Sequence, residues 1–361
     1  MKILLQLFEK VRPVFEDKGV LSPMKPLYEA MENFFFAPAS KTLYAPFSRD
    51  PLDIKRYMSM VIIALLPCVA ASLYFFGLQI ISMIVVSYAA GGLVEVAFAV
   101  IRKEKIAEGF LVTGLIFPLV LPPATPLWMV AVGCAFGVFV GKEIFGGTGR
   151  NLFNPAIVGR CFLALAYPAA MSASWIEPGS GLTGRLLQYV TGSNVEAITS
   201  ATPLVEAKQG VFADTLHLAI GNISGSIGET SGLLIIIGGI FLLLTKVSNW
   251  RTVVGVLGSA VLFEAILHGV NPEQYAPALW HLFAGGLLFG AFFMATDPVS
   301  SPSTNQGKWI YGILIGSVAI LIRNFSGYVE GMMFAILLGN IAAPIIDEIV
   351  FSVRLRMLRN E

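Results

Sequence analysis

The sequence predicts an all-α polytopic membrane protein with about ten transmembrane helices. Two observations predict this class. Of the 361 residues, 56% are hydrophobic and 13% are charged, whereas soluble domains carry roughly 25% charged residues. The mean hydropathy is +0.76. The 24 Lys and Arg residues are balanced by 23 Asp and Glu, so the excess of positive charge that binds nucleic acids is missing.

Ten apolar runs form two groups of five, separated by a polar interval at residues 171–230. A helix needs about 20 apolar residues to cross the hydrocarbon core. The runs are 57–77, 79–101, 110–122, 126–145 and 155–170, then 231–247, 252–270, 278–296, 309–322 and 329–353. We therefore expect five parts along the chain: an N-terminal segment 1–56, a first five-helix repeat 57–170, the loop 171–230, a second repeat 231–353 and a tail 354–361.

The positions of Lys and Arg orient these helices. Residues 1–56 contain nine of them and later segments on the same side contain eleven, whereas the opposite side contains three. Positive residues gather on the cytoplasmic side of membrane proteins. Both termini are therefore expected to be cytoplasmic and 171–230 to be external, which requires an even number of spans.

The third run of each group ends in a proline-rich turn, at 121–126 (LPPATP) and 296–302 (TDPVSSP). The second runs also match, because each contains a glutamate, Glu95 and Glu264. These matches favour two inverted five-helix repeats with broken third helices, an arrangement in which ligands bind at the breaks. The alternative is that the prolines form ordinary turns between spans.

Thr202 lies in the predicted external loop, in the sequence EAITSATPL (196–204). From its composition alone, this threonine is a turn residue whose hydroxyl caps the next segment. The stretch, however, resembles the Ser/Thr-Gly/Ser-Ala-Thr motif at which a transferase joins FMN to threonine through a phosphoester. Ser200 and Glu196 stand where that motif often has Gly and Asp. The resemblance implies a covalent FMN on Thr202.

Further motifs extend this resemblance along most of the chain. They are similar, in the same order, to the B-type subunits of the sodium-translocating NADH:quinone oxidoreductase (Nqr) family: LYEA (27–30), RDPLDIKR (49–56), GGTGRNLFNPA (146–156), FMATDPVS (293–300), GKWIYG (307–312) and EGMM (330–333). The segment 1–56 favours this family over the related Rnf D subunit, which lacks most of it. Inverted five-helix repeats with broken third helices also resemble the urea-transporter architecture.

The resemblance implies a subunit of a multi-subunit complex in the bacterial inner membrane. It would relay electrons from FMN to a noncovalent riboflavin, and then to ubiquinone or menaquinone, coupled to Na+ translocation. Other subunits are required for NADH oxidation, because this sequence has no dinucleotide fingerprint and no iron–sulfur ligands. Two alternatives stay open: an Rnf-type subunit that uses ferredoxin, and a urea-transporter-like permease without flavin.

Asn151 and Asn154 lie three residues apart before Pro155, which predicts the first turn of a helix. Asn154 is then an N-cap, a role that needs no ligand. The resemblance implies instead that these two amides hold the riboflavin on the cytoplasmic side.

Several ionisable residues fall at membrane depth, where charge is costly and function is the default hypothesis. For Arg160, Glu95 and Glu264 the alternative is structural pairing. Asp297 differs, because it precedes Pro298 where a helix breaks, and Thr296 and Ser300 add hydroxyls beside it. Hard cations bind such oxygens, so a transient sodium ion is expected there.

The resemblance also ties four acidic residues to sodium handling or turnover: Glu29, Glu108, Asp297 and Asp347. Glu29 and Glu108 lie on the cytoplasmic side, where the alternative is a solvated surface.

Overall fold

The computed structural model describes residues 54–103, 109–179, 202–208 and 210–360, together with isolated positions elsewhere. Every regular element in these residues is a helix. Six helices are long and apolar enough to cross a membrane, and α5, α7 and α11 are shorter apolar helices of 11–13 residues. The polytopic helical class is thus confirmed, with six long spans where the sequence predicted about ten.

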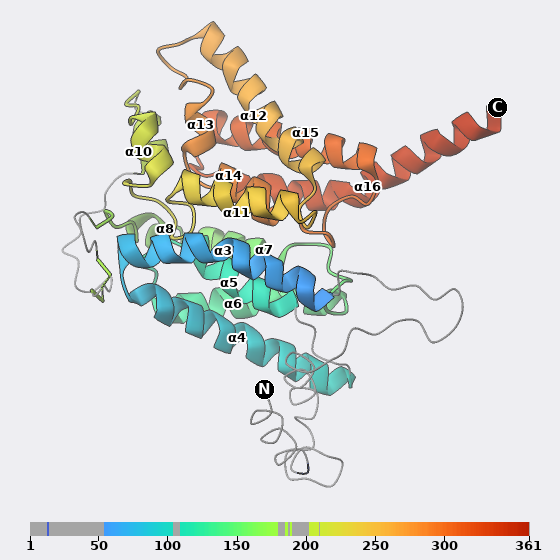
Figure 1. Cartoon of the computed structure of the whole chain (residues 1–361), viewed down its shortest axis with the longest axis horizontal. Coiled ribbons are helices and arrows are strands. Elements are labelled where there is room, and N and C mark those ends of the chain that lie inside the picture. The colour runs from blue at the N-terminus through green and yellow to red at the C-terminus, as the bar shows by residue number, and fades with distance from the viewer. Residues whose placement is uncertain are drawn as a thin grey trace.

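The first half of the chain forms one layer of helices (Figure 1). Its members are α3 (Ile54–Phe76), α4 (Gln79–Arg102), α5 (Gly109–Leu119), α6 (Leu127–Gly141), η2 (Glu143–Phe145), α7 (Pro155–Ala166) and α8 (Pro168–Ala173). Two short helices follow, α9 (Pro203–Ala207) and α10 (Thr215–Ile220).

The second half forms the other layer, above the first in Figure 1. Its members are α11 (Gly232–Leu244), α12 (Trp250–Val270), α13 (Trp280–Phe283), α14 (Leu287–Phe289), the π-helix η3 (Gly290–Met294), α15 (Asn305–Phe325) and α16 (Met332–Asn360). The eighth predicted run is therefore divided, with a break at 284–286 and a π-helix before Thr296.

The helices pack in the same order in both halves. In each half the second helix packs on the fourth and the fourth on the fifth: α4 on α6 and α6 on α7, then α12 on α15 and α15 on α16. The first helix also contacts the third segment in each half. Between the halves, α3 packs on α11 and α7 on α16.

Helices α3 and α11 run antiparallel in close contact. The Tyr57 hydroxyl, at the start of α3, donates to Val247 O just after α11 (2.5 Å), and Ser72 Oγ, near the end of α3, donates to Ile227 O before α11 (2.9 Å). A Cβ at Gly238 would collide with Ala64 O. The two helices can approach this closely only because Gly238 has no side chain, a common device in membrane bundles.

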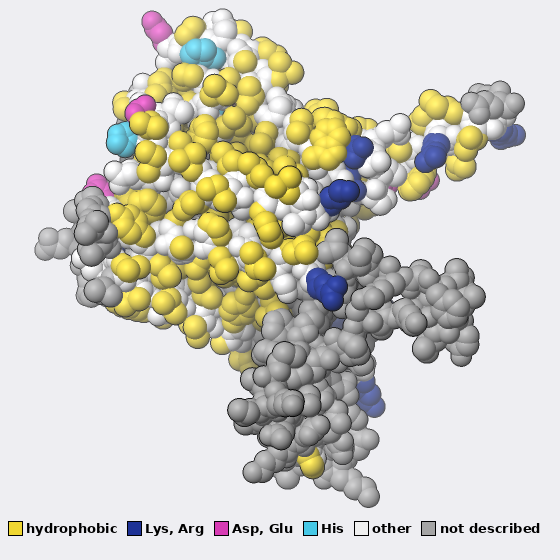
Figure 2. Space-filling view, viewed as in Figure 1, with side chains coloured by type: hydrophobic (Ala, Val, Ile, Leu, Met, Phe, Trp, Pro, Cys, Tyr) yellow, Lys and Arg dark blue, Asp and Glu magenta, His cyan; other side chains and the backbone are white. Residues whose placement is uncertain are grey.

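Large apolar side chains cover the outside of the bundle. Leu93 is 72% exposed and Val270 78% exposed. Figure 2 shows this apolar surface between an end where Lys and Arg gather and an opposite end that carries Asp, Glu and His. Because lipid solvates apolar groups, such a surface suits a bilayer.

Candidate functional site

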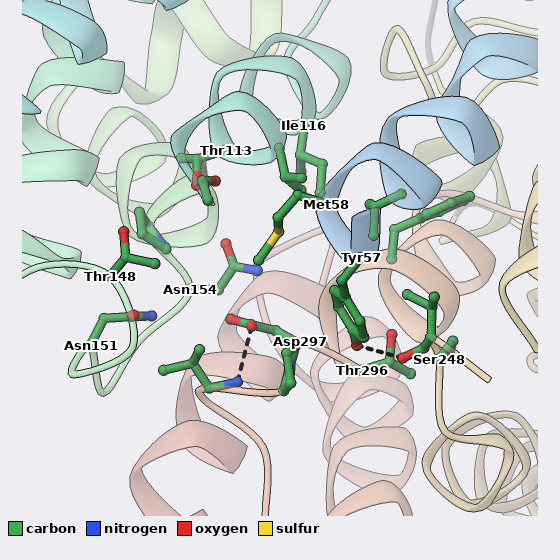
Figure 3. A pocket seen from close by; sticks show the side chains of 18 of the residues that line it. Tyr57, Met58, Thr113, Ile116, Thr148, Asn151, Asn154, Ser248, Thr296 and Asp297 are labelled. Carbon is green, nitrogen blue, oxygen red and sulfur yellow. Dashed lines mark hydrogen bonds between the residues drawn. The ribbon is translucent and has the colours of Figure 1, made fainter. Parts of the chain in front are cut away.

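A pocket that is partly open to solvent lies between the two halves. One wall comes from the first half: the start of α3, the start of α5, the end of α6, and the loop before α7. The other wall comes from the end of α11 and from the residues that follow the π-helix. Figure 3 shows Thr148, Asn151 and Asn154 on one side of the cavity, and Thr296 and Asp297 on the other. Two groups of predicted site residues, about 140 residues apart in sequence, thus share one cavity.

The two asparagines are held by the turn before α7. Asn154 is the N-cap of α7, since its Oδ1 accepts from Ala156 N (3.1 Å), and Pro155 is the first helical residue as predicted. Asn151 Oδ1 accepts from Gly149 N (3.3 Å), and its Nδ2 donates to Phe153 O (2.9 Å). Capping by Asn154 and the turn hydrogen bonds of Asn151 therefore occupy both amide oxygens and hold both side chains in the pocket wall.

Two polar groups in this wall are left for a ligand. Thr148 Oγ1 is buried without a hydrogen-bond partner in the described part of the chain. The amide nitrogen of Asn154 lines the pocket and makes no hydrogen bond to the described residues. Since orphaned buried polar groups are rare, the Thr148 hydroxyl marks a place for a ligand atom, and the Asn154 amide lies beside it in the wall. The two side chains fit a ligand that carries carbonyl and ring-nitrogen acceptors, as a flavin ring does.

Asp297 stands at the turn that follows the π-helix. Its Oδ1 accepts from Val299 N (3.2 Å), and its Oδ2 accepts from Ser300 Oγ (2.9 Å). The Thr296 hydroxyl donates to Phe292 O (2.6 Å), which leaves its lone pairs free to accept or to coordinate. A carboxylate and two hydroxyls are thereby grouped at the pocket, and π-helices often occur at functional sites.

Asp347 does not line this pocket. Its carboxylate accepts four hydrogen bonds at the start of α15: from Ser303 N (2.7 Å) and Oγ (2.8 Å), and from Thr304 N (3.1 Å) and Oγ1 (2.5 Å). These bonds attach α16 to the N-terminus of α15. Glu29 and Glu108 lie outside the described residues.

Thr202 is the N-cap residue of α9, but its hydroxyl makes no capping hydrogen bond. The simple capping role that composition suggests is therefore absent. The side chain is 8% exposed, whereas a hydroxyl on an accessible loop was expected.

Arg160 and Glu95, two of the charged residues at membrane depth, lie in ion pairs. Arg160 Nη1 lies 3.1 Å from Glu229 Oε1, and Lys142 Nζ lies 2.8 Å from Glu95 Oε1. Glu264 accepts from Asn324 Nδ2 (2.7 Å) and lies 3.3 Å from His281 Nε2. Structural pairing, one of the two interpretations of these residues, is what the geometry shows.

A further acidic residue that is largely buried is Glu330, which lies between α15 and α16. Its Oε1 lies 3.0 Å from Arg323 Nη2, and its Oε2 accepts from Gly286 N (2.9 Å) at the break between α13 and α14. Burial opposes ionisation of Glu330, but the charges of Arg323 and Arg160 and the Gly286 hydrogen bond outweigh it and hold the pKa below its usual range.

Sequence reasoning missed Lys142 and Thr148 as pocket residues. Lys142 lies near the end of the apolar run 126–145, so the sequence suggests an ordinary basic residue at the end of a span. Both residues lie within ten positions of Asn151, and this proximity to a predicted site residue was the available signal.

Comparison with known proteins identifies the family. Residues 41–355 match the family described as NQR2, RnfD, RnfE. The chain belongs to this family. Among its relatives, a protein of Klebsiella pneumoniae subsp. pneumoniae is 38% identical over 411 aligned positions, covering 98% of each chain. A protein of Azotobacter vinelandii is 38% identical, covering 99% of this chain and all of the relative. Both relatives are named as the B-type subunit of the Na(+)-translocating NADH-quinone reductase.

Proposed function

We propose that this chain is the B-type membrane subunit of a sodium-translocating NADH:quinone reductase, and that it passes electrons from a covalent FMN to riboflavin and then to quinone. The observation that carries this proposal is the shared pocket, in which Asn151 and Asn154 face Asp297 across the two halves. A flavin site and a cation site would then be close enough for electron transfer and sodium binding to influence each other.

The fold supports two inverted five-segment repeats. The helices of each half pack in the same order, and the first helices of the halves, α3 and α11, are antiparallel. In this arrangement both termini and the pocket face the cytoplasm, because the end of the bundle that is rich in Lys and Arg is the pocket end. The membrane would be the bacterial inner membrane, and the broken segment before Thr296 would supply freed backbone groups to the site between the repeats.

Thr202 is proposed to carry the FMN. Its hydroxyl is not used for capping, and the EAITSATPL sequence around it resembles the attachment motif. Because the side chain is buried, the loop before Pro203 has to expose it to the transferase, or the transfer has to precede the docking of α9.

Riboflavin is proposed to occupy the pocket, held by Asn154 and Thr148, with Asn151 supporting the turn. When bound, it supplies one- and two-electron redox chemistry. The protein contributes hydrogen bonds to the ring and apolar contacts from Val61, Ile116 and Phe292.

Sodium is proposed to pass Asp297. The described residues contain no group of three or more His, Cys, Asp or Glu side chains that could hold a metal. A sodium ion here would be bound by one carboxylate together with hydroxyl oxygens of Thr296 and Ser300 and carbonyl oxygens, a weak set that suits transient binding. We also propose that Glu29, Glu108 and Asp347 affect sodium handling or turnover, as the family resemblance implies. For Asp347 the geometry favours a positioning role at α15.

The partners are the other subunits, a ubiquinone or menaquinone, Na+ and lipid, with no role for nucleic acid. An Rnf-type subunit is the second candidate, because the matched family includes RnfD and RnfE. The near-complete coverage of relatives named as the B-type component of the Na+-translocating reductase favours the first.

The test is to purify the complex and precipitate it with acid. Covalent FMN should stay with this chain, which should fluoresce in a denaturing gel, and riboflavin should appear in the supernatant. An Asn154→Asp/Thr148→Val variant should lose riboflavin while the chain keeps its fluorescence. A colourless, non-fluorescent chain would support a permease instead.

A further inference from the structure

The last part of α16 projects beyond the rest of the bundle, on the side where α15 begins (Figure 1). Where the two helices meet, Asp347 accepts hydrogen bonds from Ser303 and Thr304. Helix α15 has 21 residues and is about 31 Å long, which is enough to cross the hydrocarbon core. The start of α15, and with it Asp347, therefore marks one boundary of the core.

The helix continues well past this boundary. From Asp347 to Asn360 it rises about 20 Å. The headgroup layer on each side of a bilayer is only about 5–8 Å deep. Leu355 lies about 12 Å beyond the boundary, so this residue and those after it stand outside the headgroups, where lipid does not cover them.

The projecting part carries an apolar stripe. Phe351, Leu355 and Leu358 are spaced i, i+4 and i+7, so they lie on one side of the helix. They are 46%, 66% and 61% exposed. Figure 2 shows hydrophobic and basic side chains together on this arm. An apolar stripe with this spacing is typical of a helix that binds in a groove of another protein.

Two arginines flank the stripe. At about 100° per residue, Arg354 lies along one edge of it and Arg359 along the other. Neither forms an ion pair within the described part of the chain. No Asp or Glu occurs at residues 349–360, so the arm is positively charged throughout. A groove with acidic side chains along its rim would complement this charge.

Residues 1–53 of the same chain are an alternative occupant of the stripe. They contain basic and acidic side chains in equal number, so their overall charge does not complement that of the arm. Charge complementarity therefore favours a different polypeptide.

We propose that the stripe of Phe351, Leu355 and Leu358 binds in an apolar groove of another subunit of the complex, and that acidic side chains along this groove pair with Arg354 and Arg359. This inference rests on the proposed function, which makes the chain one subunit of several. The projecting end of α16 is then a docking helix outside the membrane.

The experiment places photoreactive benzoyl-phenylalanine at single positions of the arm in the purified complex. At Leu355 and at Leu358, irradiation should join this chain to one other subunit, and sequencing of the adduct should place the link beside Asp or Glu residues. Val353 is the matched control, because it lies about 160° from Leu355 around the same helix. Little of this adduct should form from Val353.

Charge reversal tests the two arginines. Arg354→Glu/Arg359→Glu should reduce the yield of the Leu355 adduct at least about tenfold, because like charges then face each other across the groove. Arg356→Glu is the control, since Arg356 lies away from the stripe, and it should change the yield much less. If the double reversal does not assemble, Arg354→Gln/Arg359→Gln should shift the yield in the same direction.

Leu355 adducts that contain only lipid, or only residues 1–53 of the same chain, would overturn the inference. An adduct from Val353 as strong as that from Leu355 would do the same, because it would show that no particular side of the helix is bound. A complex that assembles with normal flavin content but gives no adduct would overturn the role of the arm alone. If no other subunit copurifies with the wild-type chain, the proposed function fails as well.

Discussion

Arg160 offers a direct test of how the two halves are held together. Its guanidinium lies 3.1 Å from Glu229 Oε1 and donates to Ser226 Oγ (3.3 Å). The side chains of Arg160 and Glu229 are only 7% and 3% exposed. Arg160→Met keeps most of the apolar volume but leaves Glu229 without its closest cation. Breaking a buried ion pair in this way costs about 3–5 kcal/mol.

The double variant separates pairing from packing. Glu229→Gln alone should cost a similar amount, because it leaves a buried arginine uncompensated. Arg160→Met/Glu229→Gln should cost much less than the sum, with a coupling energy of at least about 2 kcal/mol. Arg354→Met is the control, since this exposed arginine lies near the end of α16 and surface changes shift stability by about 0.5 kcal/mol or less.

The assay is the unfolding free energy of the purified protein in mixed micelles of increasing SDS content, followed by tryptophan fluorescence. Additive single effects would refute the reasoning, because they would mean that the two charges do not interact. The reasoning would also be refuted if Arg160→Met lowered the unfolding free energy no more than Arg354→Met does. Removing one partner of a buried ion pair should cost more than removing an exposed charge.

Four other predictions follow from the sites. Thr202→Val should abolish in-gel flavin fluorescence while the protein still inserts, and fluorescence that persists would assign the flavin to another residue. Asp297→Asn should raise the sodium concentration needed for quinone reduction at fixed ionic strength with normal flavin content, since it removes only the charge; an unchanged titration would leave Asp297 as a helix-break cap. Cysteines placed singly at Ser193 and Asn360 should react with an impermeant reagent from opposite sides, and labelling from one side would contradict the even number of spans. Asp347→Ala should lower the unfolding free energy by about 1–3 kcal/mol, because it removes all four hydrogen bonds at α15, with riboflavin content unchanged; a loss of riboflavin would show that this clamp supports the pocket.

The sequence predicted features that depend on residues close together in the chain, namely the positions of the helices and the start of α7. Apolar runs located the helices because hydropathy reports directly on the solvent that a segment prefers. The start of α7 was also predictable, because Asn154 and Pro155 suit the N-cap and first helical positions regardless of what surrounds them.

Partners in space were not predictable from the sequence. Arg160 pairs with Glu229, 69 residues away, and Asp347 binds the start of α15 from the following helix. In a membrane, lipid is as apolar as leucine, so hydropathy marks which segments are buried but not which of them meet. For the same reason the place of Lys142 in the pocket wall became visible only once the end of α6 and the loop before α7 lay on one side of a cavity.

The contacts between the halves differ at their two ends, and this difference has a mechanical consequence. At the end away from the pocket, Ile227 N and Gly228 N donate to Leu121 O (3.0 Å) and Leu119 O (2.6 Å), next to the Arg160–Glu229 pair. At the other end the cavity separates the walls, and the Tyr57 hydroxyl, which donates to Val247 O, joins them. More contacts fix the end where Arg160 pairs with Glu229 than fix the pocket end. The two halves are therefore expected to separate more readily at the pocket than at the opposite end.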